Sequence, residues 1–380
     1  MKIHYFDFVA SGGVHTTFNS AMIEVLNKVY PQNEEIILYS ERMHGEIVKG
    51  KCSSAITLKN LRFLFSKVVR FSKVRDLFSI LFLLPKIIFA SKGDILFVGL
   101  CFPFTIRFIN FFSQIFRRPI FVTLHGEMQY FLDCDKRYIQ VQHKKYFTST
   151  RKCFARKNKY VHYVILGEPI WKNISFLFNK ENKVIVINHP AIFSEVNSKK
   201  IKEDNDTLTI GMIGGGLERK GVKSLFEIAG LLKDEIESKK LVLKICGFYS
   251  GENKNKVLVS YSNHVLSEYE LKEEIESLDY SLQLTTDKIC KAIASGTFID
   301  SLIFGKPIIG LHSSYLDFYC LDNYSVLSSE KEIAEKIKKI LNDGKRNFYE
   351  NDLNETFKIR KQFSIEYNTE LFLKQLWSEK

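Results

Sequence analysis

The sequence predicts an α/β protein with two domains, each built on a parallel β-sheet with helices on both faces. Two observations lead to this expectation. The chain has 380 residues, whereas a single hydrophobic core rarely grows beyond about 250–300 residues. The order strand, glycine-rich loop, helix, strand also occurs twice, once from residue 2 and again from residue 209. This order is typical of the βαβ unit of a parallel sheet.

The first half contains short runs of apolar, β-branched and aromatic residues between turn residues, which is the pattern of buried parallel strands. The predicted strands are residues 2–9, 35–40, 94–100, 119–124, 160–166 and 184–187. Residues 18–30 have helical periodicity, and Pro31 ends that helix. Residues 59–92 are also predicted to be helical.

The second half repeats this arrangement. The predicted strands are residues 209–213, 241–247, 280–284 and 307–311, and the predicted helices are residues 222–232, 268–277, 297–304 and several from 330 onward. A polar, charged stretch separates the two halves. We therefore expect one domain at residues 1–193, a linker at 194–207 and a second domain at 208–355.

The composition is that of a globular protein, with 45% hydrophobic and 26% charged residues. The seven cysteines include no CxxC pair and no zinc-type spacing, which favours a reducing, cytoplasmic compartment. The longest apolar stretch, residues 77–90, is interrupted by Pro85 and Lys86 and is shorter than the roughly 20 residues of a spanning helix. We therefore expect neither a signal peptide nor a transmembrane segment.

The net charge is +12, and much of the excess lies in residues 59–92, where Asp76 is the only acid. Basic residues alternate there with phenylalanine and leucine, and residues 106–118 continue the pattern. This pattern is typical of an amphipathic surface that binds an anionic membrane. The alternative is a pair of core helices with solvated basic edges. No nucleic-acid motif accompanies the charge, so we do not expect a nucleic acid partner.

Residues 210–225 (IGMIGGGLERKGVKSL) contain a strand, a glycine loop and the start of a helix. Gly215 and Gly216 allow the backbone to approach a phosphate closely, and the helix N-terminus supplies N–H groups and a partial positive charge. Arg219 and Lys220 would add full charges to a diphosphate. The alternative is a tight turn with solvated basic residues.

Residues 294–310 (ASGTFIDSLIFGKPIIG) contain a second such turn. Ser295, Gly296 and Thr297 would start a helix whose hydroxyl and N–H groups are free to bind an anion. Asp300 lies one turn into this helix, where a carboxylate can accept hydrogen bonds from both hydroxyls of a ribose. The alternative is an ordinary capped helix.

Together these segments resemble the donor-binding half of GT-B glycosyltransferases, most closely the retaining, GT4-like family that contains many bacterial polysaccharide enzymes. The matching features are Lys220-Gly221 after the glycine loop, LVLKICG, and HVLSEYELKEEIESLDYSLQL, whose Val265 matches a donor-site valine. In the family's E-x7-E motif, Asp300 takes the second acidic position and Ala292 the first, which departs from the pattern. The Ser-Gly-Thr turn also resembles the inverting, MurG-like branch of this fold.

The resemblance extends to the first half of the chain. Gly12 and Gly13 match a glycine loop that abuts the donor diphosphate, and the LHGE segment places His125 where the family has a histidine beside the transferred sugar. Glu127 is a candidate base or a helix N-terminal carboxylate, and His125 is alternatively a strand-end histidine that caps backbone. The final residues, 356–380, resemble the helix that crosses back to the first domain.

The resemblance implies two Rossmann-like domains facing across a cleft, and a hexosyltransferase that uses a nucleotide-sugar donor. We expect retaining transfer to a glycan or lipid-linked glycan in surface polysaccharide synthesis, on the inner face of the membrane. No Asp-x-Asp pair follows a nucleotide-binding strand, so no metal is expected, and no cofactor either. The alternatives are a catalytically inactive GT-B partner protein, which Ala292 suggests, and a GT-B nucleotide-sugar epimerase.

Overall fold

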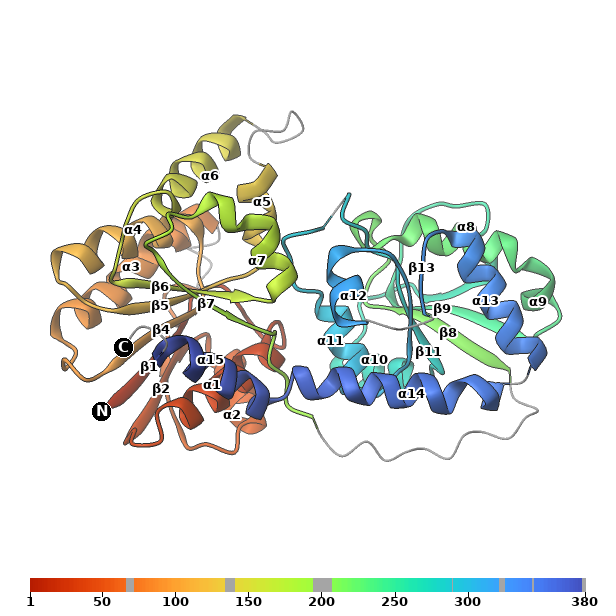
Figure 1. Cartoon of the computed structure of the whole chain (residues 1–380), viewed down its shortest axis with the longest axis horizontal. Coiled ribbons are helices and arrows are strands. Elements are labelled where there is room, and N and C mark those ends of the chain that lie inside the picture. The colour runs from red at the N-terminus through yellow and green to blue at the C-terminus, as the bar shows by residue number, and fades with distance from the viewer. Residues whose placement is uncertain are drawn as a thin grey trace. The chain divides into compact units, whose positions relative to one another are not determined.

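The computed structural model describes residues 1–65, 72–133, 141–193, 207–288, 290–320, 325–343 and 345–377. They form two compact units (Figure 1). Unit 1 comprises residues 1–192, 292–294 and 363–380, and unit 2 comprises residues 193–291 and 295–362. Each unit has a parallel sheet with helices on both faces, so the predicted fold class is confirmed. The expected linker lies outside the described residues, apart from Thr207.

The sheet of unit 1 has seven strands in the order β3-β2-β1-β4-β5-β6-β7, and all neighbouring strands are parallel. Its strands are β1 (Lys2–Asp7), β2 (Glu35–Ser40), β3 (Ile56–Asn60), β4 (Ile95–Leu100), β5 (Ile120–Leu124), β6 (Val161–Leu166) and β7 (Lys183–Ile187). The central strands are apolar on both faces because helices cover both sides of the sheet.

One face of this sheet is covered by α1 (Thr16–Val29), α2 (Arg42–Lys51) and α15 (Ile365–Trp377), and the other by α3 (Ser72–Phe89), α4 (Pro103–Ile115) and α6 (Val141–Phe154) (Figure 1). The helices α5 (Glu127–Asp133) and α7 (Glu168–Ile174) follow β5 and β6, and the 3₁₀ turn η2 (Ser175–Leu177) continues α7. Phe18 of α1 and Phe372 of α15 join the same buried cluster over β1 and β4.

The C-terminal helix α15 packs on unit 1, as expected for the crossing-back helix. It also completes the edge of the sheet. The Val186 N–H donates to Gln375 Oε1 at 2.8 Å, and Gln375 Nε2 donates to the Val186 carbonyl at 2.7 Å. Because β7 is an edge strand, these two bonds satisfy backbone groups that no neighbouring strand reaches. The expected boundary at residue 356 falls inside a longer helix of unit 2, and the chain enters unit 1 at Phe363.

Unit 2 has a six-stranded parallel sheet in the order β10-β9-β8-β11-β12-β13. Its strands are β8 (Leu208–Ile213), β9 (Leu241–Phe248), β10 (Val259–Ser262), β11 (Tyr280–Gln283), β12 (Ile308–Leu311) and β13 (Val326–Leu327). Its helices are α8 (Val222–Leu231), α9 (Lys233–Glu237), α10 (Glu268–Glu276), α11 (Gly296–Ile303), α12 (Ser314–Tyr319), α13 (Glu330–Asp343) and α14 (Lys345–Gln362), with 3₁₀ turns η3 (Glu218–Lys220) and η4 (Lys256–Leu258).

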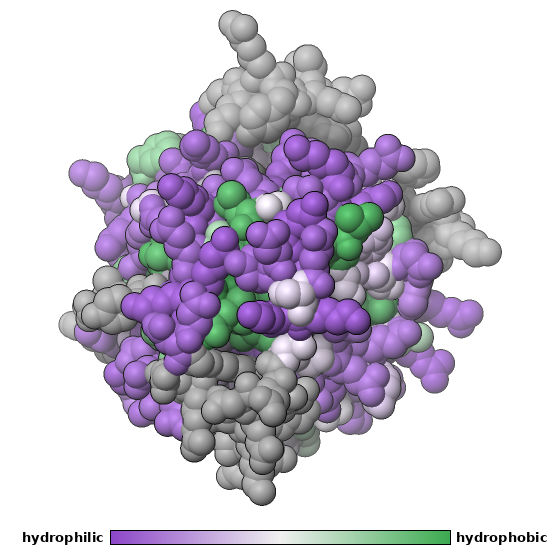
Figure 2. Space-filling model, turned by 90° about the vertical axis from the view of Figure 1, so that its right-hand side faces the viewer, coloured by the Kyte–Doolittle hydropathy of each residue, from purple (hydrophilic) through white to green (hydrophobic). Residues whose placement is uncertain are grey.

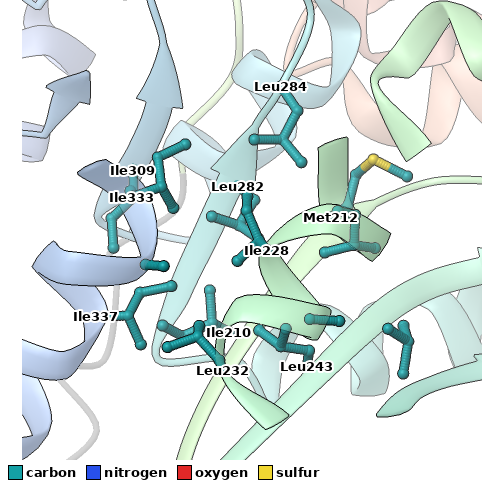
Figure 3. Close-up of a cluster of buried hydrophobic side chains, with 14 of the residues drawn as sticks. Ile210, Met212, Ile228, Leu232, Leu243, Leu282, Leu284, Ile309, Ile333 and Ile337 are labelled. Atoms are coloured by element: carbon teal, nitrogen blue, oxygen red, sulfur yellow. The ribbon is translucent and has the colours of Figure 1, made fainter. Parts of the chain in front are cut away.

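The core of unit 2 forms where α8 and α13 cover one face of its sheet. Ile210, Leu243 and Leu282 from the strands meet Ile228 of α8 and Ile337 of α13 (Figure 3). This packing fixes α8 against β8, and therefore fixes the glycine loop that joins them.

One prediction about local structure is wrong, and several elements are not predicted. Residues 59–92 are not helical throughout, because Lys59 and Asn60 end β3 and α3 begins only at Ser72. Strand β3 is a sheet edge with mostly exposed or half-exposed side chains, so it lacks the apolar run of a central strand. Helix α2 is not predicted at all, because two glycines and many polar residues hide its periodicity. The edge strands β10 and β13 are too short to give a pattern.

Candidate functional site

In open parallel sheets, ligands bind outside the carboxyl ends of the strands, at the point where the strand order reverses. That point lies between β1 and β4 in unit 1, and between β8 and β11 in unit 2.

The glycine loop of unit 1 follows β1 and is held by buried polar groups. Gly12 has a φ of +55°, a region that glycine adopts without strain. An added Cβ there would meet no protein atom within 4 Å, so the space beside the loop is open. Asp7, at the end of β1, is fully buried and its Oδ1 accepts the N–H groups of Val9 and Ala10, each at 2.8 Å. The loop is therefore fixed before any ligand binds.

His125 follows β5 at the same edge of the sheet and is only 9% exposed. Its ring packs edge-on against Phe18, with 4.4 Å between the ring centroids. Its Nε2 has no hydrogen-bond partner among the residues that the structure describes. Burial, and to a lesser extent the neighbouring His15 and His189, hold the pKa of His125 well below its usual value. The side chain is therefore neutral at pH 7, with a nitrogen that can bond a ligand.

Glu127 begins α5, two residues after His125. Its Oε1 accepts the His125 backbone N–H at 2.9 Å. Burial raises the pKa of Glu127 to about 7, against the opposing effect of the amides of His125 and Glu127 itself. A carboxyl group with a pKa near neutrality is suited to general acid–base chemistry. The catalytic roles of His125 and Glu127 remain predictions.

Two further histidines lie beside His125 that the sequence did not single out. His15 is the N-cap residue of α1, with a φ of 59°, and its ring centroid lies 5.5 Å from that of His125. His189 follows β7, and its ring centroid lies 5.1 Å from that of Phe18. The position of His189 just after a predicted strand, residues 184–187, is the signal that could have found it. In the described ranges, no three His, Cys, Asp or Glu side chains are arranged to hold a metal ion.

Replacing Glu127 by glutamine is expected to change how stability depends on pH. Because the folded pKa of about 7 exceeds the ordinary value of 4.5, the contribution of Glu127 to stability is greatest below pH 4.5 and is lost as the pH rises through 7. Glu127→Gln removes this loss, which amounts to about 3 kcal/mol for a shift of this size. Thermal melts from pH 5 to 8 should show the variant gaining on the wild type as the pH rises. A constant difference across that range would contradict the raised pKa.

In unit 2, the loop after β8 brings Lys220 against its first glycine. Gly214 has a φ of +84°, and a Cβ added there would lie 2.5 Å from Lys220 Nζ and 3.7 Å from Thr297 Cγ2. Gly221 also has a φ of +84°, and an added Cβ would collide with the Leu284 backbone after β11. Gly214 is therefore required by its backbone conformation, and Gly221 by both its conformation and its close packing. The result is a lysine held at the switch point of the second sheet.

The environment of Lys220 includes charges of both signs. Burial lowers its pKa most, the nearby Arg219 lowers it further, and Asp300 opposes the shift. Arg219 itself is exposed. Lys220, Thr297 and Asp300 therefore lie close together, as the two sequence segments predict for one binding region. Gly215 and Gly216 complete the loop and pack against Phe248, the last residue of β9, and Tyr249, the residue after it.

The turn at the start of α11 differs from the expectation in one respect. Ser295 Oγ accepts the Phe298 N–H at 3.2 Å and lies 3.1 Å from Thr297 Oγ1. Thr297 Oγ1 donates to Gln283 Oε1 at 3.1 Å. The two hydroxyls are thus engaged within the protein rather than free. The groups that α11 offers an anion are the N–H groups of Gly296 and Thr297, because Ser295 already accepts the Phe298 N–H.

Val265 and Ala292, two other predicted positions, lie outside the Lys220 loop and the first turn of α11. Val265 lies in the loop between β10 and α10 and is 80% exposed, and no described contact joins it to Lys220 or Asp300. Ala292, at the first acidic position of the family motif, is buried and belongs to unit 1. Its N–H donates to Gln129 Oε1 at 3.1 Å.

Comparison with known proteins gives structural matches only. Neither a protein-family model nor a curated protein matches this sequence. HepE from Anabaena, solved with UDP-glucose, has 12% identity and a TM-score of 0.61 over 100% of both chains. The lipopolysaccharide outer core galactosyltransferase WaaB has 13% identity and a TM-score of 0.61 over 100% of both chains. TarM from S. aureus, solved with UDP among its ligands, has 13% identity and a TM-score of 0.61 over 99% of this chain and 100% of TarM.

The chain has the GT-B fold. Identities this low establish the architecture and leave the reaction open. The comparison therefore supports the two Rossmann-like units, while the site residues rest on the geometry given above.

Proposed function

We propose that this protein is a glycosyltransferase that moves a hexosyl group from a UDP-sugar to a glycan or lipid-linked glycan, with retention, in surface polysaccharide synthesis. The observation that carries the proposal is Lys220 held against Gly214 at the switch point of the second sheet, beside Asp300 and the start of α11. Positive charge, a glycine loop and a helix N-terminus together favour a diphosphate ligand. HepE and TarM, which share the fold, were solved with UDP-glucose and UDP.

The proposed mechanism follows from where charge develops. When the bond between the sugar and the diphosphate breaks, the leaving UDP gains negative charge. Lys220, Arg219 and the first N–H groups of α11 stabilise that charge, because donors fixed in advance lower the barrier without reorganising. For unit 1 taken by itself, the proposal is that the loop of Gly12 and Gly13 contacts a nucleoside diphosphate. His125 and Glu127 are the candidates for contacting the sugar and moving a proton.

Calorimetric titration with UDP and UMP tests the donor half of this proposal. Because the proposed contacts are to the diphosphate, UDP should bind measurably and UMP should bind at least about tenfold more weakly, equivalent to about 1.4 kcal/mol. The same titration with UDP-glucose and other UDP-sugars ranks the donor. Equal affinities for UDP and UMP would contradict a diphosphate site at Lys220.

Asp300→Asn tests recognition of the ribose. The substitution keeps the size of the side chain and removes its charge, so the fold is retained and hydrogen bonds to the ribose hydroxyls weaken. Binding of UDP should fall by about tenfold, because a hydrogen bond to a charged group contributes about 1.5–3 kcal/mol. Wild-type protein should likewise bind 2′-deoxy- and 3′-deoxy-UDP less tightly than UDP. If both deoxy nucleotides bind as well as UDP, Asp300 does not contact the ribose.

The proposal includes binding to an anionic membrane through α3 and α4 of unit 1. These helices pack against each other, and Asp76, the only acid in residues 59–92, is buried between them. Its carboxylate accepts the N–H groups of Phe104 and Thr105, each at 2.7 Å, and so caps α4. The Asp76 carboxylate is therefore engaged inside the protein, so its negative charge does not offset the positive charges of the surface.

Both helices also expose large apolar side chains. Leu77 and Leu81 of α3 are 54% and 59% exposed, and Phe111 and Ile115 of α4 are 60% and 53% exposed. By contrast, the face in Figure 2 is mainly hydrophilic, with small and separate hydrophobic groups. Exposed apolar residues beside basic ones fit the interface of an anionic bilayer.

One basic residue of this region, Arg118, is not where the sequence pattern predicts it. Arg118 is buried and donates to the Ser91 carbonyl, so it is not part of the surface. Lys67 and Arg70 lie outside the described residues. Among the residues that are described, no helix has both the length and the apolar composition needed to cross a bilayer.

A further inference from the structure

The glycine loop of unit 1 is supported by a buried side chain of α2, a helix that the sequence did not predict. His44 is fully buried, and its Nδ1 lies 3.0 Å from the Gly12 carbonyl oxygen. A carbonyl oxygen can only accept a hydrogen bond. The Nδ1 atom must therefore carry a hydrogen and donate it to Gly12, which it does in the Nδ1–H tautomer and in the protonated ring but not in the Nε2–H tautomer.

The other side of the His44 ring faces a buried carboxylate. His44 Nε2 lies 3.3 Å from Asp7 Oδ2, and both side chains are fully buried. Asn19 Nδ2 completes the group, donating to Asp7 Oδ2 at 2.5 Å and lying 2.8 Å from His44 Nε2. Burial lowers the pKa of His44, but its hydrogen bond to Asp7 and the Asp7 charge raise it more, so the net shift is upward.

A second contact joins α2 to the same glycine. Glu41 caps α2 by accepting the Met43 and His44 N–H groups, at 2.9 and 2.8 Å. Its Oε2 also accepts the Gly12 N–H at 3.3 Å. Both backbone polar groups of Gly12 are thus bonded to α2, at a residue whose φ of +55° sets the direction of the loop.

We infer that His44 is a positioning residue for nucleotide binding. By donating from Nδ1 to the Gly12 carbonyl while Asp7 orients the opposite side of its ring, it holds the glycine loop in the conformation that receives the donor diphosphate. This inference rests on the proposed function, because it requires that the loop contact a nucleoside diphosphate. His44 itself contacts no ligand in this role.

Two substitutions at position 44 separate positioning from general support of the fold. In His44→Asn, the amide nitrogen takes the place of Nδ1 and can still donate to Gly12. In His44→Gln, the amide group takes the place of Nε2, so the contact with Asp7 is kept and the bond to Gly12 is lost. The probe is UDP, titrated by calorimetry into each full-length variant, with the melting temperature recorded alongside.

We expect His44→Gln to weaken UDP binding by about tenfold, since one buried hydrogen bond contributes about 1 kcal/mol and the loop loses its fixed conformation. His44→Asn should bind UDP nearly as well as the wild type. Both variants should melt below the wild type, because each leaves a buried polar group without its partner. The affinity for UDP should therefore depend on whether the hydrogen bond to Gly12 is present, whereas the melting temperature should fall in both variants.

Glu24→Gln provides the matched control. Glu24 is a buried carboxylate of α1 whose Oε1 accepts the N–H groups of Ser53 and Ser54, just beyond the other end of α2. Its replacement should lower the melting temperature and leave the affinity for UDP unchanged. If His44→Gln binds UDP as tightly as the wild type, the inference is wrong and the proposed function stands. The same conclusion follows if His44→Asn and Glu24→Gln weaken UDP binding as much as His44→Gln does. If the wild type does not bind UDP, both fail.

Discussion

Lys220→Ala should reduce turnover of the UDP-sugar by at least about a hundredfold, the usual cost of removing one donor that stabilises developing negative charge. Lys220 is half-buried against Gly214, and its substitution leaves the loop from Gly214 to Gly221 without a lysine. Because the lost contact is to the diphosphate, affinity for UDP should fall as well. Initial rates and calorimetry on the same preparations measure the two effects.

The matched control for Lys220 is Lys223, the second residue of the following helix, α8. Lys223 is exposed and forms a surface ion pair with Glu218 at 2.9 Å. Such pairs contribute about 0–1 kcal/mol, so Lys223→Ala should leave both turnover and stability nearly unchanged. Lys220→Arg keeps the charge and should retain part of the affinity for UDP. Wild-type turnover in Lys220→Ala would remove the main support for the proposed mechanism.

Replacing Leu81 and Phe111 together by serine should release the protein from anionic vesicles. Fully burying a large apolar side chain contributes about 1.5–3 kcal/mol, so two partly inserted side chains lost together should weaken binding by at least about tenfold. Raising the salt concentration should weaken vesicle binding by the wild type, because each Lys or Arg near the membrane surface contributes about 1 kcal/mol of attraction and salt screens this attraction. Co-sedimentation with vesicles of defined lipid composition measures both effects.

The control for the membrane surface uses exposed apolar residues of unit 2. Leu231 and Val257 are 43% and 83% exposed but lie outside α3 and α4. Their replacement by serine should leave vesicle binding unchanged, and neither double variant should lose activity on a short soluble acceptor. Equal binding of the wild type to neutral and anionic vesicles, or binding to neither, would favour core helices with solvated basic edges instead.

The parts of the fold that the sequence predicts well are those with a strong local pattern. Central strands such as β4 and β5 are buried on both faces, so they appear as uninterrupted apolar runs. Edge strands β3 and β10 are half-exposed and short, and their sequences resemble loops. Helix α2 carries the support of the first glycine loop, yet its glycines and charges give no apolar stripe.

Among the site residues too, those in a strong local sequence pattern can be predicted and the others cannot. Gly214 and Lys220 are adjacent in a recognisable motif, and their proximity follows from local backbone geometry. His15, His44 and His189 come from separate elements that only the folded sheet brings to one edge. Single histidines carry no local pattern, so their grouping with Asp7 and His125 depends on strand order, which a single sequence specifies weakly.

The central claim is that this chain transfers sugar from a UDP-sugar rather than only binding nucleotide. The most direct measurement is release of UDP from a panel of UDP-sugars, with glycan and lipid-linked glycan acceptors present, by wild-type protein and by Lys220→Ala at equal concentration. The proposal predicts that at least one UDP-sugar is consumed with acceptor-dependent release of UDP, and that Lys220→Ala loses this release. If UDP-sugars bind but none is consumed with any acceptor, the chain is a nucleotide-binding partner with the GT-B fold and not a transferase.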